Sequence, residues 1–209
     1  AHGRVGIADI LSLSCNAGAG YASMTVGALD FYEKLRSFGF GSRTGITLPS
    51  ETPGTIAAPG TKTWSLRSQP TIGMGQEVFV SAVQMTAAAV AIADGGTLMK
   101  PYVVARALGP DGEVAYENEP QAVRRVISQR ASRMILDAME KGSSEAGTGF
   151  RAKIGDVRMA VKTGTAQMID LSTGKYSADD YIASTLAIFP SDAPRVVVYL
   201  AIVKPTQGP

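Results

Sequence analysis

Two short stretches of the chain carry side chains that can move a proton and hold an anion. Lys162-Thr163-Gly164-Thr165 combines an amine with two hydroxyls, and Ser14-Cys15-Asn16 offers a hydroxyl and an amide that both donate and accept hydrogen bonds. By residue type, these two stretches are candidates for proton transfer and for binding an anion.

Each stretch taken alone is a weak signal. Lys-Thr-Gly occurs by chance in roughly one chain in twenty-five of this length at average residue usage. Threonine is common in strands through its β propensity alone, and Asn commonly ends helices. The functional interpretation therefore depends on the order in which these and other motifs occur along the chain.

The composition excludes several classes of site and partner. The 209 residues carry 20 Lys and Arg against 18 Asp and Glu, a net charge of +2, so nucleic acid is not expected as a partner. A single cysteine, Cys15, excludes an intrachain disulfide and a cysteine-based zinc site. A single histidine, His2, excludes multi-histidine metal sites and is a poor candidate for a catalytic triad so near the terminus. We expect no metal and no cofactor.

Four helices and one long irregular segment are expected in the first two thirds of the chain. Apolar spacing, caps and terminal glycines predict helices over Ile7–Ser14, Ser23–Phe38, Ala82–Ala93 and Ser128–Lys141. The segment Gly41–Gln76, rich in Gly, Pro, Ser and Thr, is expected to be an ordered excursion with short elements of its own or a function. No apolar run approaches the roughly 20 residues that a membrane-spanning helix needs.

The remaining elements are expected to be strands. Leu98–Leu108 and Glu113–Tyr116 flank Pro110-Asp111-Gly112 and predict a hairpin. Val157–Met168, Tyr181–Phe189 and Arg195–Val203 predict three strands of an antiparallel meander. Helices followed by a meander indicate an α+β fold, an antiparallel sheet flanked by helices.

The two chemical stretches belong to a longer series of motifs. The series runs Ser14-Cys15-Asn16-Ala17-Gly18; Phe38-Gly39-Phe40-Gly41 with Thr44-Gly45-Ile46 and Glu51; Ile72-Gly73-Met74-Gly75-Gln76 followed by Val80-Ser81-Ala82-Val83-Gln84-Met85; and Ala160-Val161-Lys162-Thr163-Gly164-Thr165-Ala166-Gln167. In this order the series resembles the motifs of the class B penicillin-binding proteins, the peptidoglycan D,D-transpeptidases. The resemblance extends from about His2 to Pro205, and it implies the serine β-lactamase/transpeptidase-like fold.

Three departures from the family pattern bear on the prediction. Cys15 replaces the usual residue between serine and asparagine, and Val161 stands where the family has glycine. The nucleophilic Ser-x-x-Lys of the family should precede Ser14, where the chain has only 13 residues. Ser172-Thr173-Gly174-Lys175 fits that pattern as text, but glycine and the position between two strands argue against the required helix. We therefore expect residues 1–209 to be a partial transpeptidase domain, incomplete at both ends, without the upstream Ser-x-x-Lys helix and the final helix.

The resemblance implies a role for each residue of the two stretches. Ser14 would relay a proton, Asn16 would hold a substrate amide and the catalytic lysine, and Lys162 would orient Ser14. Thr163 and Thr165 would bind the terminal carboxylate, and the Thr165 backbone N–H would supply half of the oxyanion hole. Gly164 would let the substrate lie against the strand as an added β-strand.

The implied activity is acyl transfer from D-alanyl-D-alanine stem peptides, with acylation by β-lactams. A D,D-carboxypeptidase or β-lactamase remains an alternative, and so does a non-catalytic relative that binds peptidoglycan or β-lactams, because the fold alone does not guarantee function. The expected partners are peptidoglycan stem peptides, β-lactams, the upstream segment and the membrane machinery of cell-wall synthesis. The resemblance also implies an extracytoplasmic location, with the parent protein anchored in the cytoplasmic membrane by an N-terminal helix.

Overall fold

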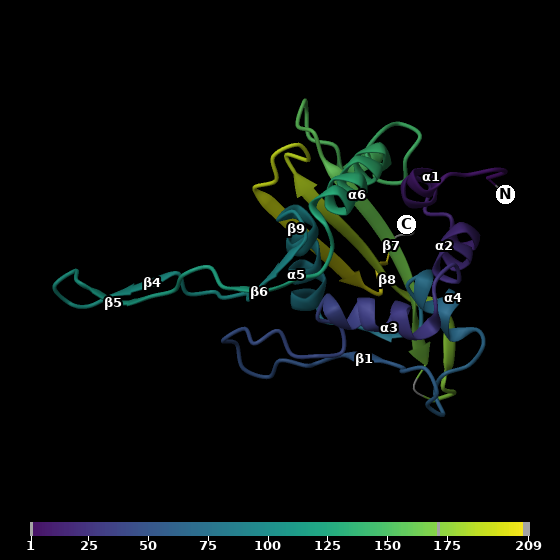
Figure 1. Ribbon diagram of the computed structural model, residues 1–209, viewed down its shortest axis with the longest axis horizontal. Helices are drawn as coiled ribbons and strands as arrows, with labels where there is room; N and C mark the ends of the chain where they lie inside the picture. Colours follow the sequence, from purple (N-terminus) through teal and green to yellow (C-terminus); the bar gives the residue numbers. More distant parts are fainter. Residues whose placement is uncertain (1, 171, 207–209) are drawn as a thin grey trace.

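A three-stranded antiparallel sheet forms the centre of the computed structural model, which describes residues 2–170 and 172–206 (Figure 1). Its strands are β7 (Ala160–Asp170), β8 (Lys175–Phe189) and β9 (Val196–Val203), in the order β7-β8-β9. The predicted meander and the α+β class are therefore confirmed. The hairpin of β7 and β8 is longer than predicted, because pairing continues to Asp170 and Lys175 beyond an irregularity after Gln167.

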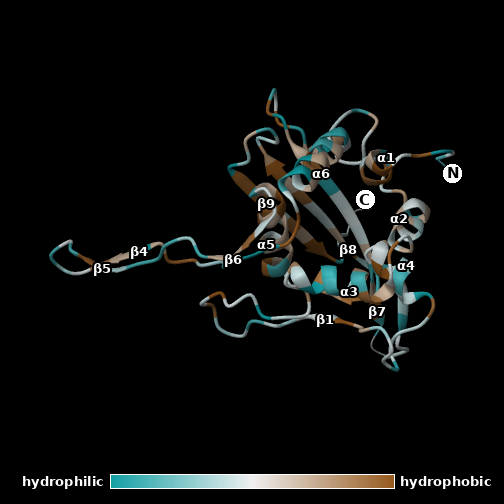
Figure 2. Ribbon diagram, in the orientation of Figure 1, coloured by the Kyte–Doolittle hydropathy of each residue, from teal (hydrophilic) through white to brown (hydrophobic). Residues whose placement is uncertain are grey.

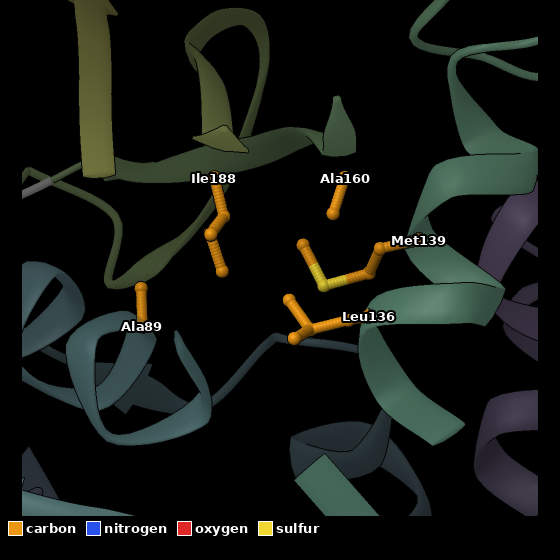
Figure 3. Close-up of a cluster of buried hydrophobic side chains, with 5 residues drawn as sticks. All are labelled: Ala89, Leu136, Met139, Ala160 and Ile188. Carbon is orange, nitrogen blue, oxygen red and sulfur yellow. The ribbon is translucent and has the colours of Figure 1, made fainter. Parts of the chain in front are cut away.

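Two helices cover one face of this sheet. They are α5 (Ala82–Ala93) and α6 (Gln129–Gly142), as predicted from their caps. The Ser81 hydroxyl accepts the N–H of Gln84, and the Ser128 hydroxyl accepts the N–H of Ala131. A buried cluster joins the two helices to β7 and β8 and forms the main core (Figure 3), made of Ala89, Leu136, Met139, Ala160 and Ile188.

The opposite face of the sheet is open along β9. Because side chains alternate along a strand, every second residue of β9 points away from the helices. The four apolar side chains on this outer face are between 43% and 57% exposed: Val196, Val198, Leu200 and Ile202. An apolar stripe of this kind on a sheet normally packs against another element.

Three short helices open the chain, and they correct two of the predicted ranges. They are α1 (Ile7–Ser12), α2 (Asn16–Ser23) and α3 (Ala28–Ser37). The prediction of one helix over Ser23–Phe38 was wrong, because the Thr25 hydroxyl closes the last turn of α2 on the Ala22 carbonyl and Gly27 caps α3 in an extended conformation. The predicted Ile7–Ser14 helix also ends earlier. Across residues 2–170 and 172–206, no helix has the length and hydropathy needed to cross a membrane.

The predicted excursion over residues 41–76 carries short elements of its own. These are β1 (Thr55–Ile56), which pairs with β2 (Val78–Phe79), and α4 (Ser68–Gly73). The buried amide of Gln84 in α5 donates to the carbonyls of Ser42 and Pro53, each at 2.8 Å. These hydrogen bonds hold the excursion against the helix whose opposite side packs on the sheet.

A long hairpin arm projects from the body of the molecule (Figure 1). The arm pairs β4 (Arg106–Leu108) with β5 (Val114–Glu117), as the turn at Pro110-Asp111-Gly112 predicted. Leu98 does not belong to the same run: it lies in β3 (Thr97–Met99), which pairs with β6 (Ala122–Arg125), a strand that the sequence analysis missed. The residues of β4, β5 and β6 are all exposed, and Figure 2 shows a hydrophilic tip with hydrophobic patches along the arm.

Candidate active site

Ser14 and Lys162 meet in the structure although 148 residues separate them in the chain. The ammonium nitrogen Nζ of Lys162 donates to Ser14 Oγ at 2.6 Å and to the carbonyl oxygen of Thr163 at 2.5 Å. Both residues are half-buried. The hydroxyl and the amine that the sequence analysis singled out are therefore within direct proton-transfer distance.

Ser14 is held in a tight turn between α1 and α2 rather than at the end of a helix. Its φ is +53°, in the left-handed region that residues other than glycine and asparagine rarely adopt. The N–H of Cys15 donates to the Ile10 carbonyl at 3.0 Å, which closes the turn over the last residues of α1. This backbone geometry turns Ser14 toward β7, and such unfavourable conformations cluster at functional sites.

A glycine at the end of α6 allows the two halves of the site to come together. A Cβ at Gly142 would lie 2.8 Å from the Val161 carbonyl oxygen and 3.9 Å from the Cα of Ser12. Only a residue without a side chain lets the end of α1 and the start of β7 approach the same point of α6. The sequence analysis expected this helix to end at Lys141 but could not assign the role of the glycine that follows.

The electrostatic environment of Lys162 suits proton transfer. Partial burial lowers the pKa of its ammonium group, because the charged form loses hydration. An amine with a lowered pKa exchanges protons more readily at neutral pH than an exposed lysine does.

Asn16 stands at the first position of α2 and is exposed. Its backbone follows Ser14 by two residues, so it lies at the same turn. Among the hydrogen bonds of residues 2–170 and 172–206, none involves the Asn16 amide, so the structure joins Ser14 to Lys162 but not to Asn16. The role expected for Asn16 stays a prediction.

The residues after Lys162 run along the free edge of the sheet. β7 is the outermost strand of its sheet, so in the described part of the chain its outer edge has no partner strand. Thr163 and Thr165 alternate with Lys162 and face a groove of about 600 Å³ on the outer side of the sheet. Gly164 lies opposite Ser184 in β8, and a Cβ at Gly164 would lie 2.9 Å from the Ser184 hydroxyl oxygen. The Lys162 amine therefore lies on one face of β7, and the hydroxyls of Thr163 and Thr165 lie on the other face.

A third threonine, Thr148, lies at the same groove and was missed in the sequence analysis. Thr163 Oγ1 donates to Thr148 Oγ1 at 2.9 Å. Thr148 belongs to the loop between α6 and the 3₁₀ turn Phe150–Ala152, and nothing in its local sequence marks it as functional. The only signal available was its position shortly before the Lys162 strand.

The segment Ser172-Thr173-Gly174-Lys175, whose sequence fits Ser-x-x-Lys, begins in a turn. Ser172 donates its N–H and hydroxyl to Asp170 Oδ1, and Lys175 is the first residue of β8. The side chains of Ser172 and Lys175 are therefore not one turn apart on a helix, in agreement with the sequence analysis.

Within residues 2–170 and 172–206 there is no group of three or more His, Cys, Asp or Glu side chains that could hold a metal ion.

The chain matches known proteins along almost its whole length. The family described as "Penicillin binding protein transpeptidase domain" matches residues 1–208. Stage V sporulation protein D of Bacillus subtilis is 34% identical over 205 residues, which make up 98% of this chain and 31% of that protein. Peptidoglycan D,D-transpeptidase FtsI of Escherichia coli is 25% identical over 202 residues, 97% of this chain and 32% of that protein. The chain thus spans about a third of the length of these curated relatives.

A solved structure shares both the fold and part of the sequence. The crystal structure of penicillin binding protein 3 from Mycobacterium tuberculosis, complexed with aztreonam, superposes with a TM-score of 0.87 at 30% sequence identity. The superposition covers 96% of this chain and 46% of that one. Together with the family match over almost every residue, this shows that the chain belongs to the penicillin-binding protein transpeptidase domain family.

Proposed function

We propose that this chain is the larger, C-terminal part of a serine D,D-transpeptidase domain that cross-links peptidoglycan stem peptides and is acylated by β-lactams. The observation that carries the proposal is the hydrogen bond between Lys162 and Ser14, on the edge strand that continues into Thr163-Gly164-Thr165. The names of similar proteins support the proposal: one is the peptidoglycan D,D-transpeptidase FtsI, and two are structures of penicillin binding protein 3 complexed with aztreonam and with ampicillin.

In the proposed reaction, a serine on an upstream segment attacks the carbonyl carbon of the penultimate D-alanine, and the lysine of the same Ser-x-x-Lys motif takes the proton of its hydroxyl. The bond to the terminal D-alanine nitrogen breaks, and that nitrogen takes a proton relayed through Ser14. Lys162 orients the Ser14 hydroxyl, and the proton that the upstream lysine took from the serine replaces the one that Ser14 gave up. An acceptor amine then attacks the acyl-enzyme, the bond to the serine oxygen breaks, and the proton that the amine loses returns to that oxygen, so the serine is restored.

The residues of the β7 edge bind the substrate in this proposal. The substrate backbone lies along the outer edge of β7 as an added strand, where Gly164 leaves room for it. The Thr165 N–H supplies half of the oxyanion hole, Asn16 holds a substrate amide, and the hydroxyls of Thr163 and Thr165 bind the free carboxylate.

The proposed protein works outside the cytoplasm as part of a longer, membrane-anchored chain. The upstream segment supplies the Ser-x-x-Lys helix, and a further segment covers the open face of the sheet along β9. The exposed apolar stripe on that strand supports this, because it lacks a covering element among the described residues. The machinery of cell-wall synthesis is its proposed macromolecular partner.

Labelling with a fluorescent penicillin, followed by intact mass, tests the proposal. We expect the full-length protein to gain one covalent adduct and the 209-residue chain to gain none. Lys162→Met in the full-length protein should lower the acylation rate by roughly 100-fold or more, because proton transfer and charge stabilisation are lost together. Lys141→Met is the matched control, since Lys141 is an exposed lysine in the last turn of α6, and it should leave the rate unchanged.

The other outcomes separate the alternatives. No adduct on either protein favours a non-catalytic binding module, whereas an adduct mapped to Ser172 in the 209-residue chain contradicts the upstream nucleophile. The lifetime of the acyl-enzyme distinguishes the remaining enzymes: rapid release by water indicates a β-lactamase or D,D-carboxypeptidase, and slow release indicates a transpeptidase.

A further inference from the structure

We propose that two copies of this chain associate through their hairpin arms, with the acidic tip of each arm docked on the basic base of the other. The tip comprises residues 106–117, and the base comprises residues 97–105 and 118–125 together with the groove beside them. This surface contains neither Ser14 nor Lys162, so the inference goes beyond the proposed function and does not depend on it.

The hairpin arm is regularly hydrogen-bonded but uncovered (Figure 1). Lys100 donates its N–H to the Gln121 carbonyl at 2.9 Å, and Asn118 donates its N–H to the Ala105 carbonyl at 2.8 Å, which fixes the register of the two strands near the body. Every residue of β4 and β5 is nevertheless exposed. An isolated two-stranded hairpin is only marginally stable in water, and its free edges can pair with another chain. The arm therefore has the properties of a surface that a partner covers.

The two ends of the arm carry opposite charge. Three carboxylates face one cation at the tip, and three cations face one carboxylate at the base: Asp111, Glu113, Glu117 and Arg106 at the tip, and Lys100, Arg124, Arg125 and Glu119 at the base. No ion pair among residues 2–170 and 172–206 involves any of these side chains. Two arms laid antiparallel therefore place an acidic tip against a basic base at both ends.

The apolar surfaces of the two ends also match. Leu108 and Val114 are paired across the tip, and their side chains are 56% and 51% exposed. The base borders a groove of about 450 Å³ that is lined mainly by apolar side chains, including Val83 and Val90 of α5. Lys100 is part of the wall of this groove. A tip docked there would remove apolar side chains from water and bring its carboxylates close to this lysine.

A second copy of the chain satisfies both ends of the arm at once. In a twofold dimer the contact from tip to base is repeated as the contact from base to tip, so one pairing forms two identical contacts and closes the assembly. Anionic lipid headgroups, by contrast, would repel the acidic tip. A different protein would need a basic and an acidic surface at the right separation, which the second copy already carries.

Sedimentation velocity of the full-length protein at increasing salt tests the inference. We expect a dimer at about 0.1 M salt, and a dissociation constant that is roughly 10-fold or more higher at about 1 M salt. The physical reason is that the Debye length falls from about 10 Å to about 3 Å over this range, which screens attraction between exposed charges.

Two charge-reversed variants test which surfaces meet. Asp111→Lys with Glu113→Lys makes the tip basic, and Lys100→Glu with Arg125→Glu makes the base acidic. Each variant alone should have a dissociation constant roughly 10-fold or more above that of wild type, since like charges then face each other in both contacts. An equimolar mixture should form a heterodimer with an affinity close to that of wild type, because every tip then meets a base of opposite charge.

Lys62→Glu is the matched control. Lys62 is an exposed lysine outside the arm and outside the residues that line its groove, so its reversal should leave the dissociation constant unchanged. Circular dichroism of each variant reports whether it is folded, and recovery of the dimer in the mixture shows independently that both variants are.

Three results would overturn the inference. A wild-type protein that stays monomeric at every concentration leaves the arm to a different partner. A dimer that neither reversal weakens has its interface elsewhere, and two weakened variants that do not recover on mixing show that tips and bases do not meet. Labelling of the same samples with a fluorescent penicillin tests the proposed function separately, so the two proposals can fail independently.

Discussion

Ser14 combines a chemical role with an unfavourable backbone conformation. Its hydroxyl accepts a hydrogen bond from Lys162 while its φ of +53° lies in the left-handed region. A residue with a Cβ in this region costs of order 1–2 kcal/mol relative to glycine. The surrounding contacts, including those between α1 and α6, must offset this cost for the site to remain formed.

Replacement of Ser14 by glycine and by alanine separates these two properties. Both variants lose the hydroxyl, but only Ser14→Gly relieves the positive φ. We expect S14G to be more stable to unfolding than S14A by about 1 kcal/mol. At a position with negative φ in a helix or strand, the order is reversed, because a glycine variant is usually less stable than the alanine variant by a similar amount. Chemical denaturation of the two variants measures the difference, and an S14A variant that is the more stable would show that the turn relaxes.

The elements that hold the site are joined by a small polar network behind it. Glu140 of α6 accepts two hydrogen bonds from Arg158, at 2.8 and 2.9 Å, and one from the buried hydroxyl of Ser191 in the β8–β9 turn. The network ties α6 to the residues that lead into β7 and to the far end of the meander. It therefore fixes the register of the helix that carries Gly142 relative to the strand that carries Lys162.

Glu140→Ala tests this network. We expect a loss of about 1–3 kcal/mol in the free energy of unfolding, because the variant leaves the buried Ser191 hydroxyl without its acceptor. The hydrogen bonds from Arg158 and then Ser191 lower the pKa of Glu140, so the stabilisation is complete above the carboxyl's ordinary pKa and is lost as pH falls through the lowered one. The difference between wild type and E140A should therefore shrink below about pH 4.

Asp137→Ala provides a control on the same helix. Asp137 pairs with Arg133 at 3.2 Å, but both side chains are about half exposed. Surface pairs of this kind contribute about 0–1 kcal/mol, so D137A should differ little from wild type at any pH. Equal losses in E140A and D137A would show that the network contributes nothing beyond a surface charge.

At the scale of the whole molecule, the two faces of the sheet differ in how they are covered. α5 and α6 bury the inner face, where Ile188 and Ala160 are fully buried. The outer face along β9 keeps its apolar stripe exposed. The same stripe borders the groove at the β7 edge, so a segment that covers β9 would also form one wall of the proposed substrate site.

Leu200→Lys should have opposite effects on the short and the long protein. In the 209-residue chain it reduces the exposed apolar area, so we expect less aggregation and weaker binding of a hydrophobic dye. In the full-length protein, where we propose that the stripe is covered, the buried lysine should cost roughly 2 kcal/mol of stability. Leu66→Lys is the control, since Leu66 is 98% exposed and should be neutral in both. Equal behaviour of L200K in both proteins would show that β9 stays uncovered.

The sequence by itself determined the elements whose signals are local. Ser81 and Ser128 mark the starts of α5 and α6 through side-chain caps, and glycines mark their ends. The meander followed from apolar runs separated by turn residues, and the family followed from the order of its motifs. Where local signals were mixed the prediction was wrong: the apolar period continues through Met24–Gly27, so the break between α2 and α3 was not visible.

Only the tertiary structure decided how these elements form a site. The 2.6 Å contact between Ser14 and Lys162, the close approach at Gly142 and the hydroxyl pair of Thr148 and Thr163 each join residues from different elements. The physical reason is that a cap or a turn depends on residues within a few positions. A contact between residues 148 positions apart depends instead on how the helices pack on the sheet, which no local pattern encodes.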